Sequence, residues 1–343
     1  RIIMSFKVAL NFEDGVTRVI ECNDGETVLD AAYRHQVKLP MDCSDGVCGT
    51  CKGSCKQGTY DLGDEYIDEA LTDDEAADGL ILTCQMLPQS DVVVSIPAAS
   101  SLCASGPQSI TSTITSVNAL SDTTIELNVA LSEPLNFLPG QYINLGLPNS
   151  DETRAYSFSS CPGSKDASFL IRNVPNGLMS TYLSKNANAG DVLPVTGPLG
   201  SFYLRAVERP VLMLAGGTGL APILSMLASL VQAPTSQPVY LLYGVTNVDD
   251  LVKLEALQEY AEALDNFSYA TVVVNPDSAH EKLGFVTDHM ESVPFALADA
   301  DAYLCGPPPM VDAVRQYFKD AGTNPYSFHY EKFNPSQPKE EAA

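Results

Sequence analysis

The amino-acid sequence predicts a multidomain protein with a small α+β domain, an antiparallel β-barrel and an α/β doubly wound domain, in that order. Three observations support this prediction. Near the N-terminus, a loop with cysteines in the spacing C-x4-C-x2-C follows a hairpin and a helix. The middle of the chain contains strand-like runs separated by evenly spaced turn signals, as in a barrel. The last part alternates between strands and helices, as parallel sheets do.

The composition limits what the protein can be. It has 343 residues, 45% of them hydrophobic, which is enough for two or three folded domains. A formal net charge of −24 argues against a nucleic-acid partner. No apolar run reaches the roughly 18 residues of a membrane span, so no membrane association is expected. The acids concentrate in residues 1–100 and 206–343, which flank a nearly neutral middle and also suggest three units.

The first domain is predicted to span residues 1–97. Residues 5–21 alternate as two strands around an Asp-Gly turn, and Thr27 suits the N-cap of the helix that follows. Residues 92–96 are expected to form the closing strand. Residues 98–107 are small, uncharged and rich in Pro, Gly and Ser, so a linker is predicted there.

The other two domains are predicted from their strand patterns. Residues 108–206 contain six strand-like runs and one helix near residues 178–186, which indicates the barrel. Residues 207–336 alternate buried strands with amphipathic helices and indicate a doubly wound parallel sheet. Residues 337–343 are expected to be a loose tail.

The cysteine spacing is the most informative pattern in the chain. Cys43, Cys48 and Cys51 are close in sequence, and Cys84 follows at a distance. Four thiolates can hold two irons, and this spacing is typical of plant-type [2Fe–2S] clusters, whereas zinc sites usually pair two short spacers. Cys55 is a rival ligand that fits the spacing less well, so it is interpreted as a structural thiol. The nine cysteines form no disulfide pattern, which favours a cytoplasmic protein.

Two glycine-containing turns in the third domain indicate a nucleotide site. Gly216-Gly217-Thr218-Gly219 joins an apolar strand to a helix, where glycines let a diphosphate approach and the helix N-terminus attracts negative charge. Cys305-Gly306-Pro307 also follows a strand and precedes a helix, so both turns are expected at one edge of the sheet. The alternatives are an ordinary strand–helix turn and, for Cys305, a buried structural thiol.

The barrel contributes two candidate binding segments. Residues 154–159 read Arg-Ala-Tyr-Ser-Phe-Ser, so aromatic and hydroxyl side chains alternate along one strand. An arginine can clamp a phosphate and an aromatic ring can cover a flat cofactor. Residues 177–181 put Ser and Thr at a helix start, where they either cap the helix or accompany a pyrophosphate.

In this order, these segments resemble the ferredoxin–NADP reductase superfamily. The run at 154–159 is similar to its flavin motif, Gly177-x-x-Ser-Thr to its flavin pyrophosphate site, and residues 216–219 to its pyridine-nucleotide site. Cys305-Gly-Pro-Pro-Pro-Met is similar to its nicotinamide-side loop. Residues 5–97 resemble a plant-type ferredoxin, which has a β-grasp-like fold. The domain order resembles the reductase component of benzoate 1,2-dioxygenase-type ring-hydroxylating dioxygenases.

The resemblance implies roles for individual residues. The residues around the nicotinamide and the flavin N5 would be Ser157, Cys305 and Glu331. The cluster ligands would be Cys43, Cys48, Cys51 and Cys84. The cofactor-binding residues would be Arg154, Tyr156, Ser157, Phe158, Ser159, Ile171, Arg172, Val174, Gly177, Met179, Ser180, Thr181, Gly217, Thr218, Gly219, Gly244, Cys305, Gly306, Pro307 and Phe333. Tyr330 is a rival to Phe333 for stacking on the flavin, because the chain continues beyond Phe333.

The resemblance implies an NADH-dependent reductase that passes electrons through FAD and a [2Fe–2S] cluster to the terminal oxygenase of an aromatic-ring dioxygenase, benzoate-type. The preference for NADH has separate support, because Tyr243–Asp250 carries two acids and no cation and would repel a 2′-phosphate. Two alternatives stay open. One is the reductase of a phenol or hydrocarbon monooxygenase, and the other is a stand-alone flavin oxidoreductase whose cysteine domain is a zinc or interaction module.

Overall fold

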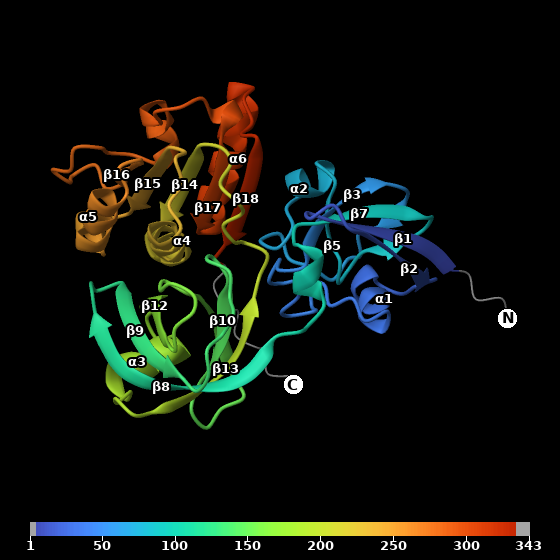
Figure 1. Ribbon diagram of the computed structural model, residues 1–343, viewed down its shortest axis with the longest axis horizontal. Helices are drawn as coiled ribbons and strands as arrows, with labels where there is room; N and C mark the ends of the chain where they lie inside the picture. The colour runs from blue at the N-terminus through green and yellow to red at the C-terminus, as the bar shows by residue number, and fades with distance from the viewer. Residues whose placement is uncertain (1–4, 334–343) are drawn as a thin grey trace. The chain divides into compact units, whose positions relative to one another are not determined.

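A computed structural model describes residues 5–333, which form two compact units (Figure 1). One unit holds the chain up to Pro107 together with Leu199–Ser201, and the other holds Gln108–Pro198 and the chain from Phe202. The predicted tail at 337–343 lies outside the described residues. Within the described range, no helix is both long and apolar enough to cross a membrane. The finer domain boundaries stay predictions.

The N-terminal unit is built on a five-stranded sheet in the order β2-β1-β7-β3-β5. β1 (Ser5–Phe12) and β2 (Thr17–Asn23) form the expected antiparallel hairpin, and β7 (Val92–Ile96) runs parallel to β1. β3 (Lys52–Gln57) and β5 (Leu80–Leu82) complete the sheet. The sequence pattern did not predict β3 and β5, because they lack a clear alternation of apolar and polar residues.

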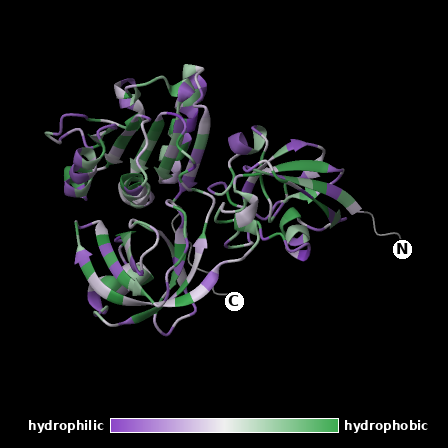
Figure 2. Cartoon of the chain, in the orientation of Figure 1, coloured by the Kyte–Doolittle hydropathy of each residue, from purple (hydrophilic) through white to green (hydrophobic). Residues whose placement is uncertain are grey.

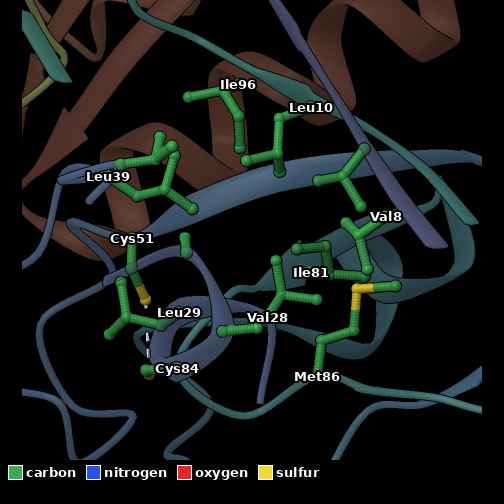
Figure 3. Packing of buried hydrophobic residues seen from close by; sticks show 14 of the residues in the cluster. Val8, Leu10, Val28, Leu29, Leu39, Cys51, Ile81, Cys84, Met86 and Ile96 are labelled. Carbon is green, nitrogen blue, oxygen red and sulfur yellow. Dashed lines mark hydrogen bonds between the residues drawn. The ribbon is translucent and has the colours of Figure 1, made fainter. Parts of the chain in front are cut away.

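Two short helices accompany this sheet. Thr27 caps α1 (Val28–Arg34) by accepting a 3.1 Å hydrogen bond from the Asp30 amide, as expected. Buried residues of α1 pack on the sheet core that Figure 3 shows. α2 (Asp73–Ala77) begins at a Thr72 cap, and a small ribbon of β4 (Tyr60–Asp61) and β6 (Leu87–Pro88) lies apart from the main sheet.

The segment predicted as a linker packs on the N-terminal unit as far as Cys103. It contains a short 3-10 helix, η1 (Ser100–Cys103). The carboxylate of Asp14 accepts hydrogen bonds from the amide and the hydroxyl of Ser100, at 2.9 and 2.7 Å. Cys103 is buried, and its carbonyl accepts a 2.9 Å bond from the amide of Lys38. Only the residues after this helix therefore remain to connect the unit to β8.

The second unit begins with a six-stranded sheet in the order β11-β10-β13-β8-β9-β12. Its strands are β8 (Gln108–Ala119), β9 (Thr124–Leu131), β10 (Tyr142–Gly146), β11 (Thr153–Ser157), β12 (Asp166–Arg172) and β13 (Val192–Leu199). A bridge between Phe158 and Phe169 links the end of β11 to β12, so the sheet nearly closes into a barrel. The six strands and the helix α3 (Leu178–Lys185) match the predicted pattern.

A parallel five-stranded sheet completes this unit, in the order β16-β15-β14-β17-β18. Its strands are β14 (Val211–Gly216), β15 (Val239–Val245), β16 (Phe267–Val273), β17 (Asp301–Gly306) and β18 (Ser327–Lys332). Figure 2 colours the central strands as largely hydrophobic. One core layer contains residues of α4 (Leu220–Gln232) and α5 (Leu254–Ala263), and the other contains residues of α6 (Pro308–Ala321) and η4 (Val286–Ser292), as in a doubly wound fold.

The barrel and the parallel sheet are joined by side chains. The buried hydroxyl of Ser225 on α4 donates a 2.7 Å hydrogen bond to the carbonyl of Ser160. The hydroxyl of Thr123, just before β9, donates a 2.5 Å bond to the Asp250 carboxylate, which lies in the loop after β15. The first contact ties the barrel to α4, and the second ties the start of β9 to the loop that follows the second strand of the sheet.

We predict that Lys52→Met destabilises the N-terminal unit by about 3 kcal/mol, because a buried carboxylate would lose its cation. Glu75 on α2 is fully buried and pairs with Lys52 at 2.7 Å. Hydrogen exchange of the β3 and β5 amides in the full chain measures the effect. The Lys52→Met/Glu75→Gln variant should recover much of the loss, and a single variant as protected as the wild type would contradict the prediction.

Stability should also depend on His329, whose ring stacks on Tyr303 with centroids 5.1 Å apart. Burial and the nearby charge of Arg205 lower its pKa to about 3. The unfolded chain therefore takes up a proton between about pH 6.5 and 3 that the folded protein does not. As the pH falls through this range, the free energy of unfolding decreases by up to about 1.4 kcal/mol per pH unit. The melting temperature should fall less between about pH 7.5 and about pH 5 in His329→Gln. An equal fall in both proteins would rule this out.

Candidate functional site

The four predicted cluster cysteines come together as two pairs. The Sγ atoms of Cys51 and Cys84 are 3.3 Å apart, at the margin of the core in Figure 3. The thiol of Cys48 donates a hydrogen bond to Cys43. The two pairs are near enough for the charge of Cys43 to affect the pKa values of Cys51 and Cys84. Cys55 lies on β3 and donates to a backbone carbonyl of its own strand, so the structure does not bring it to this group.

Backbone amides of the cysteine loop point at the sulfurs. The amides of Asp45 and Thr50 donate to the sulfurs of Cys43 and Cys48, each at 3.4 Å. The hydrogen bond from Cys48 and several backbone amides lower the pKa of Cys43 to about 5. The loop thus favours the thiolate form at Cys43, and the thiolate is the form that binds metal, whereas the pKa of Cys48, which donates the hydrogen bond, is raised.

Two glycines allow the loop to take this path. Gly46 and Gly49 both have a φ of 74°, in the left-handed region that suits glycine. A Cβ on Gly46 would collide with the Glu65 carbonyl and would lie 2.7 Å from the Cβ of Tyr66. Both glycines therefore serve the bend of this loop.

The grouping of the thiols in two pairs suits a two-iron cluster. A structural zinc ion needs four ligands, each about 2.3 Å from one centre if they are thiolates. Two separate thiol pairs suit two irons that are bridged by inorganic sulfide. The residues present therefore fit a [2Fe–2S] cluster.

In the barrel, the N-terminus of α3 offers amides to an anion. Gly177 is its N-cap residue, and in the described part of the chain no side chain caps this helix. The buried hydroxyl of Ser180 is engaged, since it accepts a 2.9 Å bond from the Val174 amide and donates a 3.1 Å bond to the Arg172 carbonyl. It therefore shapes the turn before the helix, while Thr181 is partly exposed beside it.

The side chains predicted to contact a flavin divide into two groups. Those at least partly exposed are Arg154, Tyr156, Ser159, Arg172, Val174 and Thr181. Those in the barrel core are Phe158, Ile171 and Met179. Phe158 stacks on Phe137 with ring centroids 3.7 Å apart. In the core group, therefore, only backbone atoms could reach a cofactor.

Arg154 and Tyr156 lie on β11 and have polar groups suited to a flavin nucleotide. The guanidinium of Arg154 pairs with Glu152 at 3.0 Å, so a bound phosphate would compete with that carboxylate. Burial raises the pKa of Tyr156, so its hydroxyl stays protonated and can donate.

The two predicted nucleotide turns are in contact at the carboxyl edge of the parallel sheet. A Cβ on Gly219 would overlap the carbonyl oxygen of Cys305, and one on Gly216 would lie 2.5 Å from the sulfur of Met310. Gly217, in contrast, has a φ of 55° with open space where a Cβ would stand. Gly217 and the neighbouring Thr218 can thus meet a ligand, whereas Gly219 and Gly306 are needed for packing. α6 begins with Pro308, which has no amide to offer an anion.

The three predicted catalytic residues converge. Cys305 on β17 and Glu331 on β18 are register partners. Ser157, at the end of β11, donates a 3.4 Å hydrogen bond to Glu331. Cys305 is fully buried, and burial together with the Glu331 charge raises its pKa well above the ordinary value, so it stays a thiol. A hydroxyl, a thiol and a carboxylate from the barrel and the sheet therefore meet in one place.

The structure favours Phe333 over Tyr330 as the ring beside this group. Tyr330 packs in the core layer of α6, and its hydroxyl accepts a 3.1 Å bond from Arg315. Phe333 packs in the other layer, which also contains Cys305, and its amide donates to the Gly306 carbonyl at 2.9 Å.

The loop after β15 contains the two predicted acids. Asp249 is exposed, and Asp250 accepts a 3.3 Å bond from the Asn247 amide. Lys253 is the first cation after β15, and it pairs with Glu126 of β9. Gly244 is required by packing, because its Cβ would lie 2.9 Å from a methyl group of Val286.

Sequence reasoning missed Thr123 and Glu126. They contact Asp250 and Lys253, which are more than a hundred positions away. No local pattern marks an isolated Thr or Glu on a barrel strand, so only the tertiary structure identifies them.

Comparisons with known protein families agree with this arrangement. A 2Fe-2S iron-sulfur cluster binding domain matches residues 11–89. An oxidoreductase FAD-binding domain matches residues 111–203, and an oxidoreductase NAD-binding domain matches residues 213–316.

Full-length relatives share this order. The chain is 50% identical to the toluate 1,2-dioxygenase electron transfer component of Pseudomonas putida, over 97% of this chain and 100% of that protein. It is 48% identical to the 2-halobenzoate 1,2-dioxygenase electron transfer component of Burkholderia cepacia, over 97% and 99%. Identity to the phenol hydroxylase P5 protein of Acinetobacter pittii is 32%, over 96% and 95%. A solved structure, the Amycolatopsis cytochrome P450 reductase, is similar with a TM-score of 0.71 and 33% identity, over 97% of this chain and 100% of that chain.

We predict that Cys84→Ser removes most of the bound iron, because it leaves one thiol pair incomplete. Cys55→Ser is the matched control and should keep the iron content of the wild type. Iron and acid-labile sulfide, measured on proteins of equal flavin content, decide the point. Loss of iron in the Cys55 variant with retention in the Cys84 variant would reverse the assignment.

Proposed function

The chain belongs to the family of dioxygenase electron transfer components, and we propose that it oxidises NADH and delivers the electrons to the terminal oxygenase of a benzoate-type dioxygenase. The observation that carries the proposal is the 50% identity to a toluate dioxygenase component over all three domains. NADH supplies two electrons, a [2Fe–2S] cluster carries one, and FAD between them can exchange either number. The protein would thus serve the catabolism of aromatic compounds.

In this proposal the residues bind and orient the cofactors. The N-terminus of α3 and Arg154 would hold the FAD phosphates, and Phe333 would lie against the flavin ring. The turn at residues 216–219 would hold the dinucleotide, and the Cys305 turn would serve its nicotinamide end. Ser157 and Glu331 would place a hydroxyl and a carboxylate near the nicotinamide end. Cys305 is buried as a thiol and adds no charge there. The main contribution of these residues to the rate of electron transfer from NADH would then be the orientation of the two cofactors.

The benzoate-type partner is proposed over a phenol-type monooxygenase on similarity. The two relatives near 50% identity are named for toluate and 2-halobenzoate, which are ring-substituted benzoates. The phenol hydroxylase relative is 32% identical. A stand-alone oxidoreductase with a zinc module is disfavoured by the paired arrangement of the cysteines.

We also place the protein in the cytoplasm. All nine cysteines are free, and several are buried. Unpaired cysteines on this scale suit a reducing compartment.

An anaerobic titration with NADH, followed by optical and EPR spectra, tests the function. We expect NADH to bleach the flavin bands and to produce the EPR signal of a reduced cluster, and the oxygenase to consume NADH only with an aromatic carboxylate. The Cys84→Ser variant should still lose its flavin colour but should not pass electrons to the oxygenase. A protein that holds flavin and iron, yet is not bleached by NADH, would refute the proposal.

A further inference from the structure

We propose that Glu126, on the barrel strand β9, is a positioning residue for nucleotide selectivity. It holds Lys253 so that this cation does not serve the 2′-phosphate of NADPH. The inference rests on the proposed function, in which the dinucleotide binds at the carboxyl edge of the parallel sheet.

The loop after β15 is where the adenosine ribose is expected. Ligands of open α/β sheets bind outside the carboxyl ends of the strands, and the end of the second strand commonly supplies the group that meets the ribose 2′-position. Here β15 ends at Val245, and Asp249 and Asp250 follow in η3 (Val248–Asp250). An acid there accepts from a 2′-hydroxyl, whereas a 2′-phosphate needs a cation.

Lys253 is the one side chain of this loop that could supply that cation. Residues 243–252 contain no Lys or Arg, and Lys253 stands directly before α5. Its backbone has a φ of 61°, which is unusual for a residue other than glycine and is retained when surrounding contacts fix the chain. The backbone of Lys253 is therefore held in one conformation, three positions after Asp250 in the sequence.

Glu126, on the barrel, forms an ion pair with Lys253. It points outward from β9, between the buried neighbours Ile125 and Leu127, and its side chain is 14% exposed. One carboxylate oxygen pairs with Lys253. The other accepts a 3.4 Å hydrogen bond from the side-chain amide of Asn118. A carboxylate fixed on both oxygens and mostly removed from water competes well for the cation.

Thr123 strengthens the same arrangement. Its hydroxyl donates to one oxygen of Asp250, while the other oxygen accepts from the Asn247 amide. The barrel thus fixes an acid of the loop and neutralises its cation. The loop keeps a net negative charge, which repels a 2′-phosphate but not a 2′-hydroxyl.

The test is Glu126→Gln, which keeps the shape of the side chain but removes its charge. We expect the ratio of kcat/KM for NADPH to that for NADH to rise about fivefold, in line with the free energy of one partly exposed charge pair. Calorimetry should show a similar, about fivefold, gain in affinity for 2′,5′-ADP and no gain in affinity for 5′-AMP. This binding measurement does not depend on electron transfer.

Two controls assign the effect. In Glu126→Gln/Lys253→Met the gain should disappear, because the freed cation is absent. Glu133→Gln removes an exposed acid beyond the far end of β9. It should leave unchanged both the ratio of the kcat/KM values and the ratio of the two affinities. Flavin content and melting temperature show that each variant is folded.

The proposal is overturned if folded Glu126→Gln has wild-type ratios, or if its gain survives the loss of Lys253. Failure of the proposed function would look different. The wild-type flavin would then not be bleached by NADH, while the two calorimetric affinities would still report on Glu126.

Discussion

The nucleotide half of the protein depends on the close approach of two backbone turns. The turns after β14 and β17 lie side by side because their strands are parallel neighbours in the sheet. Gly219 has no room for a side chain against the Cys305 carbonyl, so glycine is a condition of this contact. The contact brings Cys305 to the edge of the sheet, and the register with β18 then places Glu331 beside it. The grouping with Ser157 follows from the barrel being joined to this edge.

Burial fixes the protonation states of a thiol in the parallel sheet and a phenol in the barrel. Cys305 stays a thiol and Tyr156 stays a phenol, because burial disfavours their charged forms. In the cysteine loop, hydrogen bonds act in the opposite direction and favour a thiolate at Cys43. The same chain thus prepares one cysteine for metal and keeps another uncharged, and the difference lies in the donors around each sulfur.

Much of this architecture can be predicted from the sequence, because strong local patterns coincide with the elements. The barrel strands, the parallel sheet and the cysteine loop were expected, and the structure contains them. β3 and β5 were missed, since their role depends on pairing with distant strands. The sequence could not show that Phe158 faces the barrel core, because strand alternation does not tell which face is inside. Contacts across a hundred residues, such as Lys253 with Glu126, leave no local signal.

The docked segment that ends at Cys103 has a consequence for electron delivery. Asp14 and Lys38 hold η1 on the N-terminal unit, and Gly106 also lies near the side chain of Lys38, so the covalent connection to β8 is a short tether. Such a tether spans at most about 3.5 Å per residue. The two units of one chain are therefore always present at a high effective concentration, whatever the protein concentration. Electron delivery within one chain is then a first-order process even when the protein is dilute.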